Sequence, residues 1–175
     1  VQTNMASRIF IDDVIIEAVP SCPEPYDVVN TSSTATNMVL DWQQFGTVAS
    51  WDVVLVPAGT PFTGNTTGLT VYNTTTKPFT TPVLPSGTLY DVYVRSNCSG
   101  TNQSTWSIAG SGFTKAPNDE CINAIPIPVN PDTECVSSVD GSLIGATNSN
   151  LGTVCTGVSN NDVWFQFTAT QATHI

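Results

Sequence analysis

Few residues of the sequence have the types and spacing that catalysis requires. There is a single histidine, His174, and no serine–histidine–aspartate triad can be assembled around it. The sequence contains no His-x-x-x-His, no Gly-x-Ser-x-Gly and no glycine-rich phosphate loop. The carboxylate pairs Asp12/Asp13 and Asp119/Glu120 are adjacent residues, which point to opposite faces of a strand and make no glycosidase pair by themselves. The sequence therefore predicts that the chain is not an enzyme.

Acidic side chains could instead hold a metal, and calcium is the cation that hard carboxylate oxygens favour. The candidates are Asp12 and Asp13 in the stretch RIFIDDVIIEAV, and Asp162 in NNDVW beside Asn160 and Asn161. Calcium takes about six to eight oxygen ligands, more than either stretch supplies. A surface aspartate pair and a solvated turn before a strand are the simpler interpretations. We therefore expect no cofactor, with calcium as the alternative.

The charge balance of the chain is strongly acidic. Four basic residues stand against 14 acidic ones, which gives a formal net charge of −10. Nucleic acid and anionic membrane surfaces both require Lys and Arg to neutralise phosphate, so both are excluded as partners. No apolar run approaches the roughly 20 residues that a membrane-spanning helix needs, which argues against membrane insertion.

The neutral part of the composition and the cysteines indicate an extracellular location. Only 10% of the residues are charged, while Thr, Ser and Asn are plentiful, as in many extracellular β modules. The five cysteines fit neither zinc nor redox spacing, and in a β-rich chain they suggest disulfides formed in an oxidising compartment. Because five is odd, at least one cysteine has no partner within the chain.

The elements that carry these residues are predicted to be strands. No window shows the 3.6-residue periodicity and caps of a helix, and Pro, Gly, Thr and Val are dense throughout. Short β-branched or aromatic runs bounded by turn residues recur. They are RIFIDDVIIEAV, NMVLDW, SWDVVLVP, LTVYNT, TLYDVYVRSN and NDVWFQFTA. Many short strands with such turns are typical of sandwiches and barrels, so the predicted fold class is all-β.

Boundary-like stretches divide the chain into three segments. Residues 1–19 end at VPSCPEP, residues 20–115 end at TKAPNDEC, and residues 116–175 form the third segment. Only the middle segment has the length of a complete small sandwich. The chain is therefore expected to be a slice of a longer protein that begins in the last strand of one domain and stops inside another.

The middle segment resembles a fibronectin type III domain. The resemblance covers about 90 residues and is carried by CPEPYDVVNTSSTATNMVLDW, SWDVVLVPAG and LPSGTLYDVYVRSNCSG. It implies a buried Trp42 on a strand whose other inward residues are Met38 and Leu40. It also implies a corner similar to Leu-x-Pro-Gly-Thr-x-Tyr, in which Leu84 packs beneath and the Tyr90 hydroxyl bonds back to the chain.

The same resemblance implies a disulfide between Cys22 and Cys98. In a fibronectin-type sandwich both positions lie at the same pole, and the bridge would close a loop of about 75 residues. Two independent thiols are the alternative. This cysteine pattern is similar to that of secreted multidomain proteins of the Bacteroidota that leave the cell by the type IX route.

Alternation along TLYDVYVRSN also predicts an outward face. Inward and outward residues should alternate, with Tyr90, Val92 and Val94 inward and Asp91, Tyr93 and Arg95 outward. Tyr93 and Trp106 could form an exposed aromatic strip that stacks on sugars, which makes surface glycans a candidate partner. Packing on the face of the sheet is the alternative. No Arg-Gly-Asp occurs, so integrin-type adhesion is excluded.

Asn-x-Ser/Thr tripeptides recur in the middle segment. They begin at Asn30, Asn65, Asn73, Asn97 and Asn102. They matter only in a host that glycosylates them; in a bacterial product they are interpreted as polar loop and edge-strand residues.

Both flanks resemble pieces of other β domains. RIFIDDVIIEAV is similar to the final strand of jelly-roll domains of the MAM and carbohydrate-binding-module kind. APNDECINAIPIPVN and NNDVWFQFTA resemble the opening half of a sandwich repeat akin to pre-peptidase C-terminal domains, with Trp164 inward and Gln166 outward. That resemblance implies the pair Cys121–Cys135, which leaves Cys155 for a partner elsewhere; Cys135–Cys155 is the alternative.

Together these observations predict a non-catalytic structural or adhesive segment of a large secreted or cell-surface bacterial protein, of adhesin or filament-stalk type. Its partners would be other domains of the same long chain or neighbouring copies, including insertion of RIFIDDVIIEAV as a donor strand. Accessory modules of a secreted protease or polysaccharide-degrading enzyme are one alternative. A carbohydrate-binding module is another.

Overall fold

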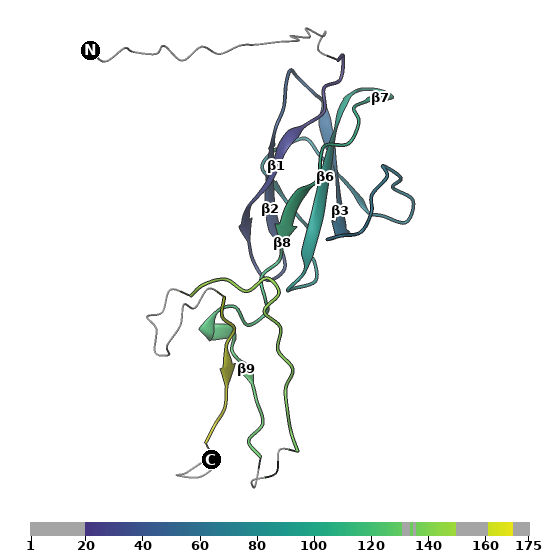
Figure 1. Ribbon diagram of the computed structural model, residues 1–175. Helices are drawn as coiled ribbons and strands as arrows, with labels where there is room; N and C mark the ends of the chain where they lie inside the picture. The colour runs from purple at the N-terminus through teal and green to yellow at the C-terminus, as the bar shows by residue number, and fades with distance from the viewer. Residues whose placement is uncertain (1–19, 131–133, 135, 150–160, 170–175) are drawn as a thin grey trace, which may run out of the picture.

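The computed structural model of the chain describes residues 20–130, 134, 136–149 and 161–169 (Figure 1). The part between Cys22 and Thr114 forms two antiparallel sheets that pack face to face. The predicted strand and calcium candidates at residues 1–19, including Asp12 and Asp13, lie outside the described residues.

The first sheet contains three strands in the order β1-β2-β5, namely β1 (Tyr26–Ser33), β2 (Met38–Gln43) and β5 (Phe79–Thr80). The second sheet has the order β4-β3-β6 and continues on the far side of β6. Its strands are β3 (Ser50–Pro57), β4 (Val71–Thr74), β6 (Leu89–Ser99), β7 (Asn102–Gln103) and β8 (Gly110–Phe113), with β7 and β8 both paired to β6. This antiparallel two-sheet arrangement is that of the fibronectin and immunoglobulin sandwiches, and the predicted all-β class is confirmed.

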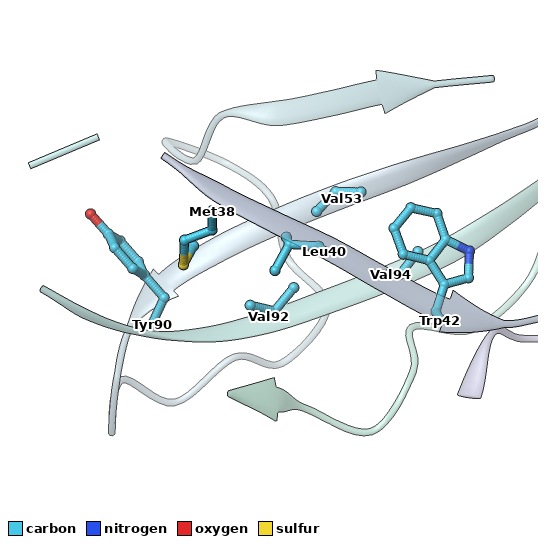
Figure 2. Close-up of a cluster of buried hydrophobic side chains, with 7 residues drawn as sticks. All are labelled: Met38, Leu40, Trp42, Val53, Tyr90, Val92 and Val94. Carbon is cyan, nitrogen blue, oxygen red and sulfur yellow. The ribbon is translucent and has the colours of Figure 1, made fainter. Parts of the chain in front are cut away.

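The core lies between the two sheets and is built by alternation along β2, β3 and β6. Strand β2 reads Met-Val-Leu-Asp-Trp-Gln, and its first, third and fifth residues are fully buried. Because successive side chains of a strand point to opposite faces, one apolar face per strand is enough to fill the layer. Figure 2 shows the cluster, which comprises Met38, Leu40, Trp42, Val53, Tyr90, Val92 and Val94. Burying each large side chain contributes about 1.5–3 kcal/mol.

The corner before β6 packs beneath this core. Leu84 is partly buried against the cluster, and its backbone N–H donates to the Thr36 carbonyl at 2.8 Å. Tyr90 is buried at the start of β6. Burial raises the pKa of Tyr90, although a hydrogen bond with the Thr88 side chain acts in the opposite direction. The predicted bond of the Tyr90 hydroxyl back to the chain stays a prediction.

The segment after the sandwich lies at the pole opposite β7 (Figure 1). It contains the short 3₁₀ turn η1 (Cys121–Asn123) and two short strands, β9 (Ile125–Pro126) and β10 (Phe165–Gln166), which pair in parallel. The predicted strand NDVWFQFTA is thus paired over two residues only, and Trp164 is half-buried while Gln166 is exposed. In the described part of the chain, no helix is long and apolar enough to cross a membrane.

Candidate functional site

The outer face of the second sheet carries a buried carboxylate, Asp52 on β3. The register of the sheet places Asp52 opposite Arg95 on β6 and opposite Asn73 on β4. Its Oδ2 accepts hydrogen bonds from Nε and Nη2 of Arg95, both at 2.9 Å. Its Oδ1 accepts from Nδ2 of Asn73 and of Asn97, both at 2.8 Å. Asp52 therefore joins three strands through side chains as well as through the backbone.

These contacts decide the charge state of Asp52. Burial alone would raise the pKa of this carboxyl group, because it disfavours the charged form. The hydrogen bonds from Asn73, Asn97 and Arg95, together with the Arg95 charge, outweigh burial and hold the pKa below its ordinary value. Asp52 is consequently a fixed anion at neutral pH, and a group of this kind is suited to holding strands together rather than to accepting a proton.

An aromatic cluster lies beside this network and includes a residue from the loop between β3 and β4. Phe62 of that loop contacts Tyr93, with ring centroids 4.5 Å apart, and meets Trp106 edge-on at 5.4 Å. The guanidinium carbon of Arg95 lies 4.6 Å from the centroid of Trp106. The backbone N–H of Gly59 also donates to Asp91 at 2.9 Å, so the loop is fastened to the sheet at two points.

This geometry bears on the predicted aromatic strip. The structure does bring Tyr93 and Trp106 to one face of the sheet, as the alternation predicted. Phe62 contacts both rings, however, and Arg95 stacks on Trp106, so the rings are engaged by the chain itself. Val54, which faces outward opposite Tyr93, is fully buried, as expected for a covered face. The geometry favours packing, and glycan binding at this strip stays a prediction.

At the opposite pole, the backbone between Thr114 and Ala116 is held from three sides. Lys115 N–H donates to Thr34 O at 2.8 Å, and the Lys115 carbonyl accepts from Gly87 N–H at 2.9 Å. Ala116 N–H then donates to Gly145 O at 3.1 Å. Gly145 has a φ of +72°, and a Cβ there would lie 2.1 Å from the Thr114 carbonyl oxygen. Only glycine permits this approach, which brings the later segment directly against the sandwich.

The junction also contains an ion pair in which the carboxylate is buried and the lysine is partly exposed. Asp119 is 2% exposed, and its Oδ2 lies 2.7 Å from Nζ of Lys115, which also bonds Oε1 of Glu120 at 3.0 Å. Asp119 further accepts hydrogen bonds from the backbone N–H and the hydroxyl of Thr147, the latter at 2.8 Å. One carboxylate thus connects the end of the sandwich to the segment that begins at Gly145.

Hydrogen bonding sets the pKa values in this ion pair. Burial would raise the pKa of Asp119, but the bonds from Lys115 and Thr147 outweigh it and lower that pKa. The bonds to Asp119 and Glu120 raise the pKa of Lys115. The sequence argument that Asp119 and Glu120 point to opposite faces of a strand was wrong, because they lie in a turn and both reach Lys115.

Asp162, a calcium candidate, makes a comparable structural contact. Its Oδ1 accepts from Ser149 N–H at 2.9 Å, and its Oδ2 accepts from the Ser149 hydroxyl. These hydrogen bonds lower the pKa of Asp162. Trp164 adds to the same contact, with its Nε1 donating to Ser149 Oγ at 3.2 Å. Across residues 20–130, 134, 136–149 and 161–169, no group of three or more His, Cys, Asp or Glu side chains could hold a metal ion.

Three of the five cysteines, Cys22, Cys98 and Cys121, lie among the described residues. The predicted Cys22–Cys98 disulfide is present, with Cα atoms 5.7 Å apart, at the pole where Ser96 Oγ donates to Pro23 O at 2.7 Å. Cys121 is exposed and forms no disulfide with another described cysteine. Cys135 and Cys155 lie outside the described residues, so the pair Cys121–Cys135 stays a prediction.

No family model and no curated protein matches this chain. Among solved structures it is similar to a myokine structure, with 19% identity over 54% of this chain and 98% of the other, at a TM-score of 0.42. It is also similar to the fn3 domain of human collagen alpha-1(XX), with 17% identity over 67% and 98% of the two chains, at a TM-score of 0.45. The fn3 domain of human contactin 1 is 16% identical over 74% and 100%, at a TM-score of 0.40. The sandwich assignment rests on the strand order and register given above.

Sequence reasoning missed the two features that organise these faces. The contact of Phe62 with Tyr93 and Trp106 brings together residues from a loop and two different parts of the chain. Asp119 and Thr147 are 28 residues apart, and neither belongs to a recognisable motif. The one available signal was the apolar Phe62 in an otherwise Thr- and Gly-rich loop, since such a residue usually anchors the loop to a neighbouring surface.

Proposed function

We propose that this chain is a non-catalytic connecting segment of a large secreted or cell-surface bacterial protein, of adhesin or filament-stalk type, exported by the type IX route. In this proposal the sandwich is a spacer unit, and binding to surfaces is done by other parts of the protein. The polar residues on the outer face of the second sheet and at the junction serve this role. Asp52 holds strands of the sheet together, and Asp119 holds the sandwich and the later segment together.

The observation that carries the proposal is the junction at residues 114–119. The backbone groups of a flexible linker would hydrogen-bond to water. Here the backbone of Lys115 hydrogen-bonds to the sandwich, that of Ala116 hydrogen-bonds to Gly145 in the later segment, and Asp119 is buried. Asn118 extends the contact, since its Nδ2 donates to Trp164 O and its carbonyl accepts from Trp164 N–H, both at 2.8 Å. A connection fixed in this way transmits orientation from one unit to the next, which is what a spacer requires.

The spacer role is tested by measuring whether the two parts tumble together. Backbone ¹⁵N relaxation of the whole chain should give the same correlation time for the sandwich and for residues 116–130. Asp119→Asn should separate the two values, because it removes the charge that pairs with Lys115. Asp140→Asn is the matched control, since it makes the same charge change at an exposed position. Independent tumbling of the unmodified chain would refute a fixed connection.

The location is tested separately in the source cells. Protease treatment of intact cells should digest the native protein, and its intact mass should be well above that of 175 residues. Loss of the type IX export machinery should retain the protein inside the cell. A protease-resistant protein of about the mass of this chain would contradict the proposal.

A further inference from the structure

The five Asn-x-Ser/Thr tripeptides differ in the exposure of the asparagine and in the hydrogen bonds made by the asparagine amide and by the hydroxyl two residues later. In three of them the asparagine amide is engaged within the sandwich. Nδ2 of Asn30 donates to Ser33 Oγ at 2.7 Å. Nδ2 of Asn73 reaches Ser50 Oγ, the Trp51 carbonyl and Asp52 at 2.8–3.3 Å. Asn97 donates to the same carboxylate, and Cys98 in its tripeptide is in the disulfide.

The fourth tripeptide, at Asn102, has an exposed asparagine, but the hydroxyl two residues later is occupied. Ser104 Oγ accepts from Ser96 N–H at 2.9 Å and donates to the Thr105 carbonyl at 2.7 Å. A transferase that reads asparagine together with the following hydroxyl would find only half of its recognition element accessible here.

In the remaining tripeptide, Asn65-Thr66-Thr67, neither the asparagine amide nor the hydroxyl is engaged in this way. Asn65 and Thr67 are exposed, and Asn65 Oδ1 accepts from Thr67 N–H at 3.0 Å, which brings the two side chains to the same side of the loop. Within the described part of the chain, neither Asn65 Nδ2 nor Thr67 Oγ1 makes a hydrogen bond. Phe62, three residues earlier, holds this loop to Tyr93. We propose that Asn65 is the acceptor of an asparagine-linked glycan, in contrast to the interpretation from the sequence that all five tripeptides are only polar loop and edge-strand residues.

The reaction requires an activated sugar, namely a nucleotide- or lipid-diphosphate-linked glycosyl donor, and a transferase that binds it. The Asn65 Nδ2 forms the new bond to the anomeric carbon, and the bond from that carbon to the diphosphate oxygen breaks. The diphosphate leaves with the electron pair, and the proton lost from Nδ2 passes to a base of the transferase. No oxidation or reduction is involved.

The position of Asn65 gives the glycan a structural consequence. The loop that carries Asn65 leads directly into β4, and β4 is an outer strand of the second sheet among the described residues. The loop projects from the side of the sandwich (Figure 1). An outer strand with unpaired backbone groups can pair with another chain, and proteins commonly cover such edges. A glycan at Asn65 would shield this edge without occupying the packed aromatic cluster.

Asn65-Thr66-Thr67 and Asn73-Thr74-Thr75 provide an internal control, because the two tripeptides are identical in sequence. The whole folded chain is incubated with UDP-glucose and an N-glycosyltransferase that reads Asn-x-Ser/Thr, and the modified residues are mapped by mass spectrometry over time. A peptide of residues 60–80 shows that both tripeptides are substrates when unfolded. We expect one hexose on the folded chain, at Asn65, added at least about a hundredfold faster than at Asn73, whose three hydrogen bonds must break first.

Two variants sharpen this test. Asn65→Gln and Thr67→Ala should each abolish modification of the folded chain while leaving its circular dichroism and melting temperature unchanged, because both side chains are exposed. Equal rates at Asn65 and Asn73 in the folded chain would overturn the proposal. So would a folded chain that stays unmodified at Asn65 while the peptide is modified there.

Discussion

Removing the Cys22–Cys98 disulfide should cost the chain a large part of its stability. The bridge joins residues 76 apart in sequence, and in the chain-entropy description a loop of this length restricts the unfolded chain by about 4.5 kcal/mol. Single domains have unfolding free energies of about 5–15 kcal/mol, so the loss is comparable with the total. For a domain of this size it corresponds to a fall in melting temperature of roughly 20 °C.

The assay is urea unfolding of the whole chain, followed by the fluorescence of its four tryptophans, of which Trp42 is fully buried. The double variant Cys22→Ala/Cys98→Ala is preferable to a reducing agent, which would also act on any bridge made by the other cysteines. Because the bridge acts mainly on the unfolded chain, the variant should have a less compact unfolded state. The slope of free energy against urea should therefore rise as the midpoint falls.

The control is Ser99→Ala, because Ser99 is exposed and lies directly beside Cys98 in the chain. It should leave both the midpoint and the slope unchanged. A double variant that loses less than about 1 kcal/mol with an unchanged slope would refute the entropic argument.

Three further predictions concern the core, the junction and the loop. Leu40→Ala should lower the unfolding free energy by about 2–5 kcal/mol in the same assay, since Leu40 is fully buried; a loss below 1 kcal/mol would contradict the packing. The junction should loosen in acid and in strong base, as followed by NMR relaxation. The lowered pKa of Asp119 makes its stabilisation complete above the ordinary value of 3.8 and lost as the pH falls through the folded pKa. The raised pKa of Lys115 makes its stabilisation complete below 10.5 and lost as the pH rises through the folded pKa. A junction equally rigid at pH 2 and pH 7 would argue against this role for Asp119. Finally, Phe62→Ala should speed amide hydrogen exchange in the loop between β3 and β4 while the slowest amides of β6 stay protected, and unchanged loop exchange would show that Phe62 is not the anchor.

Two of the strands that the sequence predicted, β2 and β6, have one apolar face. In β2 and β6, buried and less buried residues alternate along almost the whole strand, so the burial of Trp42 and Tyr90 follows from the pattern alone. Strand β8, Gly-Ser-Gly-Phe, lacks this pattern for a physical reason. A Cβ at Gly110 would lie 2.4 Å from the Val28 carbonyl oxygen, so the close approach of β1 excludes a side chain there. A short strand in which every second residue is glycine reads as a turn in the sequence.

The contacts of Asp52 on the second sheet and of Asp119 at the junction depend on residues far apart in the chain. Asp52 could be placed on an outward face, but the Asn73 and Asn97 amides that hold its charge become visible only with the register of β3, β4 and β6. Likewise, nothing in the sequence around Asp119 indicates its contact with Thr147. Local patterns therefore predicted the layers, while the ion pairs required the fold.

The Cys22–Cys98 bridge also determines how the sandwich would respond if it were pulled from its two poles. Without the bridge, unravelling residues 22–115 would release roughly 320 Å of extended chain, at about 3.4 Å per residue. With it, force entering at Cys22 passes through the sulfur atoms to Cys98, and the chain between them cannot lengthen. Only residues 99–115 could be extended, which corresponds to roughly 60 Å of chain. Under a pulling force, this sandwich would therefore lengthen by only a short distance and keep most of its hydrophobic core intact.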